Sequence, residues 1–332
     1  MSQLTKSVLE LHVDNELWMN ELKFYKDEIK ILDKYLVEIA GKNNTRDTMV
    51  GLEQFQNRML RQREVLDELM HDIRIDEDSL TGNVLHVNEI QAQKNMPIVF
   101  SPIHGASGKM VPAALKAFGF ENVHIVKEQE QPDGTFPTVI YPNPEEAEAL
   151  TMAIDLGKKT GAELVLACDP DGDRYAACVP DGKGGYDLLN GNQTGALLTY
   201  YLLSKWKELG KLDGNQFMVN TIVTTELIDE ICKGFGVTCF SVLTGFKNIA
   251  EIIRNLEGKK QFIGGGEESY GYLVGDFVRD KDGVSACAMV SEIVAYYKSQ
   301  GKTIQNVLAE IYTQFGFYKE SLISVTKKGK DG

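Results

Sequence analysis

The sequence predicts an α/β protein: two consecutive α/β domains with mostly parallel or mixed sheets, preceded by an α-helical hairpin. Glycine and proline, which interrupt regular structure, are sparse at first, since residues 1–95 hold three of the 31 glycines and none of the nine prolines. Apolar residues recur there with a helical period, whereas short β-prone runs alternate with helical patterns after residue 96. We therefore expect long helices first and many short elements afterwards.

An apolar stripe with spacings that alternate between four and three residues predicts the first helix. Its members are Trp18, Leu22, Tyr25, Ile29, Leu32, Leu36 and Ile39. After a polar break at 41–45, a second stripe runs from Leu52 to Ile73 with a polar member at Gln62. This spacing predicts an antiparallel, coiled-coil-like hairpin over residues 1–80. Because neither helix can bury its stripe alone, we expect self-association through residues 1–80, or packing on a third helix or on the rest of the protein.

From Pro97 onward, strands and helices are expected in alternation. The β-prone runs are residues 98–100, 123–126, 163–167, 217–223, 237–242 and 261–263. The helical patterns are residues 109–118, 144–160, 195–208, 225–233, 245–255 and 284–299. The strand–turn–helix rhythm occurs twice, with a helix near 193–209 between, so we place one α/β domain at 96–192 and a second at 193–320.

The overall charge limits the classes of partner. The chain carries 48 acidic and 35 basic residues, a formal net charge of -13. Phosphate backbones and anionic lipids attract basic surfaces, so the composition argues against a nucleic-acid partner and against docking on a membrane. The sequence shows no apolar run of about 18 residues, no signal-peptide pattern and only scattered cysteines. We expect a cytoplasmic protein with reduced thiols.

The strongest chemical signal is Asp169-Pro-Asp-Gly-Asp-Arg174, which directly follows the expected strand 163–167. Open α/β sheets bind ligands at the carboxyl ends of their strands. Three carboxylates at alternate positions of one turn repel each other, so Asp169, Asp171 and Asp173 are predicted to bind a hard cation such as Mg2+. Arg174 supplies a fork for a phosphate group beside that cation.

The aspartate motif fits two other known types of acidic metal-binding loop less well. An EF-hand requires Gly at its sixth position and Glu at its twelfth, where this sequence has Arg174 and Pro180. A phosphatase of the haloacid-dehalogenase type has Asp-x-Asp-x-Thr/Val, so Asp173 in the last place counts against that family without eliminating it. The metal loop of a phosphosugar enzyme and a solvated acidic turn are the other interpretations.

A glycine-rich motif at 264–271 follows the expected strand 261–263. Its glycines allow a ligand to approach the backbone closely. Glu267 and Ser269 place a carboxylate and a hydroxyl two residues apart, which suits paired sugar hydroxyls. A glycine-rich turn with surface acids is the alternative.

Two weaker motifs precede helical patterns. Thr244 and Gly245 lie where helix 245–255 is expected to start, and helix N-termini attract anions. The charged run Arg279-Asp-Lys281-Asp-Gly283 fits phosphate binding or a salt-bridged turn equally well.

His104 ends the strand at 98–100, where it either lines a cleft or supports a turn.

Taken together, five motifs in this order resemble the α-D-phosphohexomutase family, most closely its phosphoglucomutase/phosphomannomutase members. They are Pro102-Ile-His-Gly105, Asp169-Pro-Asp-Gly-Asp-Arg174, Thr244-Gly-Phe-Lys247, Gly266-Glu-Glu-Ser269 and Arg279-Asp-Lys-Asp-Gly283. The resemblance covers about residues 84–332. It implies a Mg2+-dependent isomerase of carbohydrate metabolism, with four domains around a cleft, in which a phosphoserine exchanges phosphate with hexose phosphates through a hexose bisphosphate.

The resemblance also implies roles for single residues. Asp169, Asp171 and Asp173 would bind Mg2+. Arg174 would lie against the phosphate, and Lys281 would contact the phosphate or assist proton transfer. The sugar would be held by Thr244, Gly245, Glu267 and Ser269.

The chain departs from the family pattern at two places. The phosphoserine motif Ser-His-Asn occurs nowhere in it, and the helical segment 1–80 stands where the first domain is expected. The chain reaches residue 332 without the Arg-x-Ser-Gly-Thr loop of the fourth domain. We therefore expect the second and third mutase domains in a truncated or chimaeric product, inactive alone. The alternatives are a non-catalytic, self-associating interaction protein with a vestigial sugar-phosphate and Mg2+ site, and a metal-dependent sugar-phosphate phosphatase with Asp169 as nucleophile.

Overall fold

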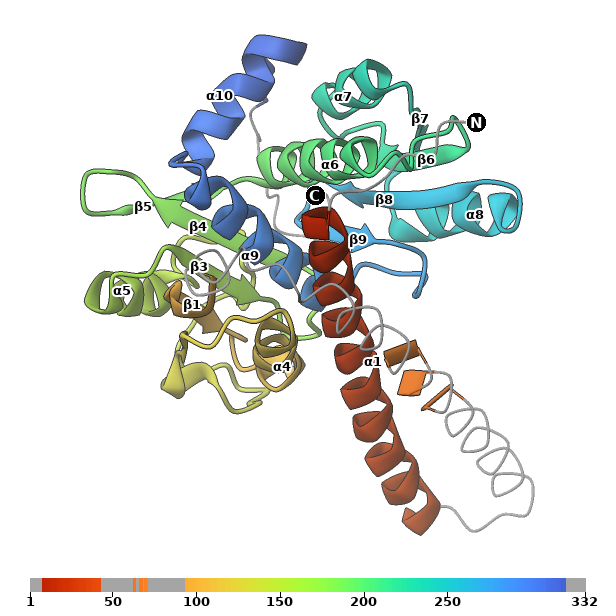
Figure 1. Cartoon of the computed structure of the whole chain (residues 1–332). Coiled ribbons are helices and arrows are strands. Elements are labelled where there is room, and N and C mark those ends of the chain that lie inside the picture. The colour runs from red at the N-terminus through yellow and green to blue at the C-terminus, as the bar shows by residue number, and fades with distance from the viewer. Residues whose placement is uncertain (1–7, 43–61, 64–65, 68, 71–92, 321–332) are drawn as a thin grey trace, which may run out of the picture. The chain divides into compact units, whose positions relative to one another are not determined.

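A computed structural model describes residues 8–42, 62–63, 66–67, 69–70 and 93–320 of the chain (Figure 1). These residues fall into two compact units. The first contains the described residues up to Met96 together with Pro112–Asn122, and the second contains Pro97–Val111 and the chain from Val123 onward. No helix in the described ranges is both long enough and apolar enough to cross a membrane.

The first unit contains the long helix α1 (Val8–Lys42) and parts of a second helical segment. Lys26 pairs with Asp67, and Asp33, farther along α1, pairs with the earlier residue Arg63. Because the pairing order is reversed, the described residues of the second segment run antiparallel to α1; the hairpin over 1–80 as a whole stays a prediction.

The apolar stripe of α1 is covered only in part. Ile29 is buried, whereas Trp18 and Leu32 are 43% and 48% exposed. Of the second predicted stripe, only Gln62, Leu66 and Leu69 are described, and the rest of it lies outside the described residues.

The second unit begins with a mixed five-stranded sheet whose order is β2-β1-β3-β4-β5. Its strands are β1 (Ile98–Ser101), β2 (Val123–Ile125), β3 (Leu164–Cys168), β4 (Tyr175–Pro180) and β5 (Tyr186–Leu189). The first three are parallel, and β4 and β5 are added antiparallel. Every residue of β3 is buried, which explains its continuous apolar run.

A helix covers each face of this sheet. Val165 and Ala167 of β3 pack in one cluster with residues of α5 (Thr151–Thr160). Successive side chains of a strand point to opposite faces. Cys168 accordingly faces α9 (Gly283–Ser299), with its Sγ 3.7 Å from Sγ of Cys287.

The second sheet has four strands in the order β7-β6-β8-β9. They are β6 (Gln216–Thr221), β7 (Thr238–Val242), β8 (Gln261–Glu267) and β9 (Gly271–Val274), with only β9 antiparallel. Helices α6 (Gly191–Glu208) and α8 (Phe246–Leu256) lie on opposite sides of this sheet (Figure 1). Phe217, Ile249 and Phe262 are part of the core beneath α8.

Two further helices pack on this unit, and α9 joins its two sheets. Helix α7 (Leu227–Phe235) packs on α6 and β7, and α10 (Ile304–Phe315) packs on α6, α7 and α9. Helix α9 contacts β9 of the second sheet and also β3 and β4 of the first. The Asp282 side chain caps α9 by accepting hydrogen bonds from the backbone N–H groups of Val284 and Ser285. One helix is thus shared between the two sheets.

The six predicted strands are present, and the helices differ mainly at their ends. The helix expected at 144–160 begins only at Thr151, because residues 143–150 form turns in which the Asn143 side chain accepts from the backbone N–H of Glu145. Helix α6 begins at Gly191, four residues earlier than expected, because Asn190 and Gln193 form a capping box. The sequence did not predict β4, β5, β9 or α10.

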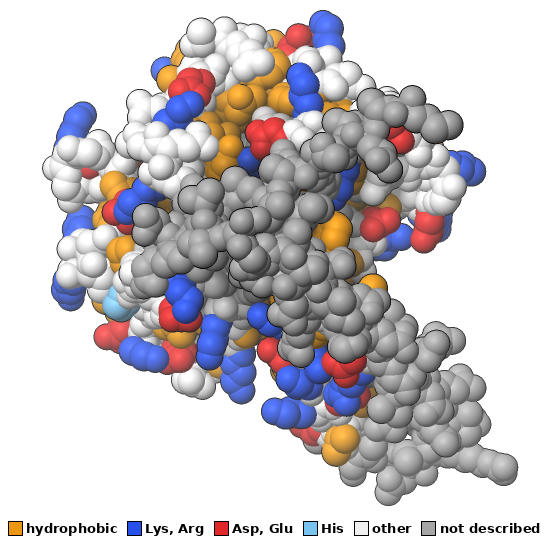
Figure 2. All heavy atoms as spheres, in the orientation of Figure 1, with side chains coloured by type: hydrophobic (Ala, Val, Ile, Leu, Met, Phe, Trp, Pro, Cys, Tyr) orange, Lys and Arg blue, Asp and Glu red, His pale blue; other side chains and the backbone are white. Residues whose placement is uncertain are grey.

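Surface charges on the described residues are mixed. Acidic and basic side chains are intermingled on the face shown in Figure 2. All five cysteines are free thiols, and four of them are buried.

Candidate functional site

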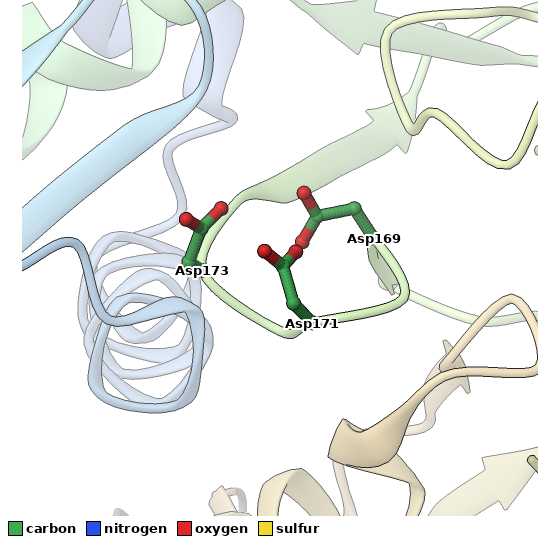
Figure 3. A group of neighbouring side chains, drawn as sticks. All are labelled: Asp169, Asp171 and Asp173. Carbon is green, nitrogen blue, oxygen red and sulfur yellow. The ribbon is translucent and has the colours of Figure 1, made fainter. Parts of the chain in front are cut away.

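The aspartate loop, residues 169–174, connects β3 to β4. Oxygen atoms of Asp169, Asp171 and Asp173 all lie within 4.8 Å of one another, and Figure 3 shows the Asp169 and Asp171 carboxylates turned toward each other. Gly172 has a φ of 78°, a left-handed conformation that favours glycine and closes the turn. The loop therefore gathers three carboxylates at the carboxyl end of β3.

Arg174 anchors the buried member of this group. Asp169 is 1% exposed, and its two carboxylate oxygens accept hydrogen bonds from the Arg174 backbone N–H (3.0 Å) and from Nε (2.7 Å). Burial raises the pKa of Asp169, and these hydrogen bonds act in the opposite direction. Burial disfavours the guanidinium, yet its contacts with Asp169 raise the pKa of Arg174 overall. Nη1 of Arg174 also contacts Glu145 at 3.3 Å.

Lys281 reaches the aspartate loop from the segment after β9. Its Nζ lies 2.7 Å from Oδ2 of Asp173. A Cβ at Gly271 would come within 2.2 Å of the Lys281 Cδ, so only glycine at this position leaves room for the lysine stem. Burial works against the charge of Lys281, but its hydrogen bond to Asp173 raises its pKa above the ordinary value. The loop thus places two cationic side chains against three carboxylates.

Glu267 lies at the start of residues 267–271, the turn between β8 and β9 that the sequence predicts to bind a sugar (the sugar-binding turn). It is 8% exposed, and its Oε1 accepts a hydrogen bond of 2.8 Å from the backbone N–H of Gly245. Ser269 is half-buried, and Thr244 is exposed. The structure therefore joins the motif at 244–245 to the motif at 266–269, although about twenty residues separate them in the sequence.

The sugar-binding turn is connected directly to the aspartate loop. The backbone N–H of Tyr175 donates to the Tyr270 carbonyl at 3.1 Å, and Arg174 forms an isolated β-bridge with Gly271. The two motifs consequently lie at adjoining strand ends of the two sheets.

The residues present fit Mg2+. Its six oxygen ligands lie at about 2.1 Å in an octahedron, so neighbouring ligands are roughly 3 Å apart and opposite ones roughly 4.2 Å apart. The three carboxylate oxygens lie within 4.8 Å of one another and would draw closer together around a bound ion. Asp171 is exposed, which leaves the site open to solvent and to a phosphate.

The side chains of Arg279 and His104 make their contacts outside this group. Arg279 is exposed and pairs with Glu257 at 3.2 Å. His104 is buried, and its Nε2 lies 2.8 Å from the Thr138 hydroxyl. That contact supports the structural interpretation of His104 over the cleft-lining one.

Two residues that sequence reasoning missed hold the sugar-binding turn in place. Oε2 of Glu268 accepts hydrogen bonds from the hydroxyls of Thr221 (3.1 Å) and Thr224 (3.2 Å). At Gly191, a Cβ would lie 1.9 Å from the Glu268 carbonyl oxygen, so α6 begins directly against the turn. No spacing in the sequence signals either contact, because both depend on how distant segments approach.

Comparisons with known proteins agree with this architecture. The family model described as "Phosphoglucomutase/phosphomannomutase, alpha/beta/alpha domain II" matches residues 78–183. The corresponding domain III model matches residues 190–315. Together they cover more than half of the chain.

Curated relatives match over a similar region. A phosphoglucomutase of Staphylococcus aureus (strain MRSA252) is 36% identical over 240 residues, which are 72% of this chain and 43% of the relative. A phosphoglucomutase of Staphylococcus haemolyticus (strain JCSC1435) is 32% identical over 317 residues, which are 94% of this chain and 56% of the relative. This second alignment takes in most of the segment before residue 84. The chain spans about half the length of these relatives.

Solved structures show the same fold. A putative phosphomannomutase from Thermus thermophilus has a TM-score of 0.56 and 24% identity, over 70% of this chain and 48% of that one. Parafusin, a phosphoglucomutase from Paramecium, has a TM-score of 0.51 and 19% identity, over 73% of this chain and 42% of that one. From the two domain matches and these relatives, we conclude that the chain belongs to the phosphoglucomutase/phosphomannomutase family.

Proposed function

We propose that this chain forms the magnesium- and sugar-binding part of a phosphohexomutase, an isomerase that moves a phosphoryl group on a hexose phosphate. One observation carries the proposal: the aspartate loop, Lys281 and the Glu267 turn converge at adjoining strand ends. In this proposal residues 96–192 are the metal-loop domain and residues 193–320 the sugar-binding domain.

The chemistry of these groups suits phosphoryl transfer, which depends on positioning and charge neutralisation. A bound Mg2+ would neutralise charge on phosphoryl oxygens, and Asp169, Asp171 and Asp173 would hold it. Arg174 and Lys281 would orient the phosphate of a hexose phosphate or bisphosphate. A second set would hold the sugar, namely Thr244, Gly245, Glu267 and Ser269.

The sequence supplies no phosphoryl donor of the expected kind. Ser-His-Asn occurs nowhere in the 332 residues. We therefore expect these residues alone to bind Mg2+ and hexose phosphates without interconverting glucose 1-phosphate and glucose 6-phosphate. Turnover by the purified chain would show that another residue donates the phosphoryl group.

Asp171→Asn is expected to weaken Mg2+ binding at least about tenfold, since even the loss of an outer-shell partner typically costs that much. Isothermal titration calorimetry would measure Mg2+ affinity, then glucose 6-phosphate affinity with and without Mg2+. We expect the sugar phosphate to bind more tightly with Mg2+ present in the wild-type chain and not in the variant.

Asp155→Asn is the matched control, because Asp155 is an exposed aspartate on α5 and should leave both affinities unchanged. Unchanged Mg2+ affinity in Asp171→Asn would exclude the metal assignment. Mg2+ binding without any sugar-phosphate binding would exclude the sugar assignment alone.

Asp169 fits the phosphatase alternative poorly. A nucleophilic aspartate needs a free carboxylate oxygen facing its substrate. Asp169 is 1% exposed, and both of its oxygens accept hydrogen bonds from Arg174. These contacts favour a ligand or anchoring role.

A second candidate role, self-association, is supported by α1. Leu32 and Tyr35 are 48% and 59% exposed on this helix, and Leu32 belongs to the heptad-like stripe. The two side chains lie three residues apart on the helix and so form adjoining apolar surface that a second copy of the chain could cover. We expect the full chain to sediment as a dimer and the double variant Leu32→Glu/Tyr35→Glu as a monomer. A monomeric wild-type chain at high concentration would contradict this role.

A further inference from the structure

A second loop lies directly against the aspartate loop. This supporting loop, residues 102–108, follows β1, and the backbone N–H of Ala106 donates to the Pro170 carbonyl at 2.8 Å. A Cβ at Gly105 would come within 2.5 Å of the Pro170 Cα and carbonyl oxygen. Only a residue without a side chain permits this approach, so the two backbones are held in contact.

The supporting loop is held in an unusual conformation. Ile103 and His104 have φ values of 46° and 59°, a left-handed conformation that is costly for a β-branched residue such as isoleucine. Hydrogen bonds keep it there: the backbone N–H of His104 donates to the Gln129 carbonyl at 3.0 Å, and its carbonyl accepts from Asp133 at 3.1 Å. These hydrogen bonds hold residues 103 and 104 in the strained conformation, and so they also fix the position of the residues that follow, including Ser107.

Ser107 carries a buried hydroxyl without a hydrogen-bond partner in the described part of the chain. The residue is 3% exposed, and its Oγ makes no hydrogen bond with any described residue. A Cβ at Gly172 would lie 3.3 Å from the Ser107 Cβ, so Ser107 contacts the aspartate loop between Asp171 and Asp173. Leaving a buried hydroxyl unpaired costs free energy, and such groups call for an explanation.

We infer that Ser107 is a positioning residue of the metal site, whose hydroxyl donates a hydrogen bond to an oxygen of the cation's coordination shell once Mg2+ is bound. The inference rests on the proposed function, since it requires the aspartate loop to bind the ion. A bound cation would draw carboxylate or water oxygens together within the aspartate loop, which Ser107 contacts at Gly172. The unpaired hydroxyl would then gain a partner among these oxygens.

Ser107→Ala tests this inference. A net hydrogen bond corresponds to about three- to tenfold in affinity, so we expect Mg2+ to bind about three- to tenfold more weakly to the variant in isothermal titration calorimetry. The thermal stability provides a second readout. Without Mg2+ the variant should melt at or above the wild-type temperature, because it loses an unpaired hydroxyl. At a fixed excess of Mg2+ it should melt below the wild type.

Ser291→Ala is the matched control. Ser291 is a fully buried serine on α9, but its hydroxyl already donates to the Cys287 carbonyl at 2.8 Å. This variant should lose stability equally with and without Mg2+ and keep the wild-type Mg2+ affinity. A merely structural role for Ser107 would likewise change stability equally with and without Mg2+ and leave the Mg2+ affinity at the wild-type value.

The possible outcomes separate the inference from the proposed function. If the wild-type chain and Ser107→Ala bind Mg2+ equally tightly while Asp171→Asn does not bind it, the role of Ser107 is refuted and the metal site stands. If the wild-type chain binds no Mg2+, the metal part of the proposed function and this inference fall together.

Discussion

Gly191→Ala is expected to lower the free energy of unfolding by about 3 kcal/mol, at the upper end of the usual cost of overpacking. The added Cβ would lie 1.9 Å from the carbonyl oxygen of Glu268 and 2.6 Å from its carbon. The obstacle is backbone, so no side-chain rotation relieves the clash, and either α6 or the sugar-binding turn has to move. Urea denaturation followed by circular dichroism would measure the loss.

Gly195→Ala on the same helix provides the control. There the nearest atom to an added Cβ is the Cδ1 of Ile228 at 3.2 Å, the end of a flexible side chain. Alanine is favoured over glycine inside a helix by about 0.5–1 kcal/mol. We therefore expect a change of no more than about 1 kcal/mol. Equal losses in the two variants would mean that close approach to the turn is not what requires glycine at position 191.

The second large effect is expected for Asp169→Asn, which should cost about 2–3 kcal/mol, somewhat below the 3–5 kcal/mol typical of breaking a buried pair because Arg174 is partly exposed. In either orientation the amide of asparagine would turn a donor toward one of two Arg174 donors, the Nε or the backbone N–H, both of which now donate to Asp169. The variant should lose both stability and Mg2+ binding. Denaturation and Mg2+ titration of the same preparation measure the two effects.

Asp171→Asn separates those two effects. Asp171 is exposed, and within the described part of the chain its side chain makes no hydrogen bond or ion pair. This variant should stay within about 0.5 kcal/mol of wild-type stability, as is usual for surface substitutions, while losing Mg2+ affinity. If Asp169→Asn were as stable as Asp171→Asn, the contact with Arg174 would not anchor the loop.

The strands that the sequence predicts are those with dense apolar or β-branched residues. Strand β3 reads Leu-Val-Leu-Ala-Cys and is buried throughout, so its apolar run is unambiguous. Strand β4 was not predicted, because it begins Tyr175-Ala-Ala and contains few β-branched residues. It is a strand because it pairs with β3 and β5 on both sides. Tertiary pairing of this kind leaves little local signal.

In the candidate site, too, contacts within one turn could be predicted from the sequence, whereas contacts between distant segments could not. Asp169, Asp171 and Asp173 share one turn, so their convergence could be predicted from spacing, and the structure brings them together. The contact between Lys281 and Asp173 joins segments more than a hundred residues apart, and no periodicity encodes it. The family resemblance assigned Lys281 to the phosphate or to proton transfer, but its contact with Asp173 was not predicted.

Helix α9 has a consequence for how this protein holds together. It belongs to the second half of the chain, yet it contacts β3 and β4 of the first sheet, and Gly283 at its start donates a backbone hydrogen bond to the Gly172 carbonyl at 3.1 Å. Cutting the chain near residue 192 would therefore strip one face of the first sheet of its cover and leave Cys168 facing water. Both sheets belong to one compact unit, in which the aspartate loop receives part of its shape from the half of the chain that follows it.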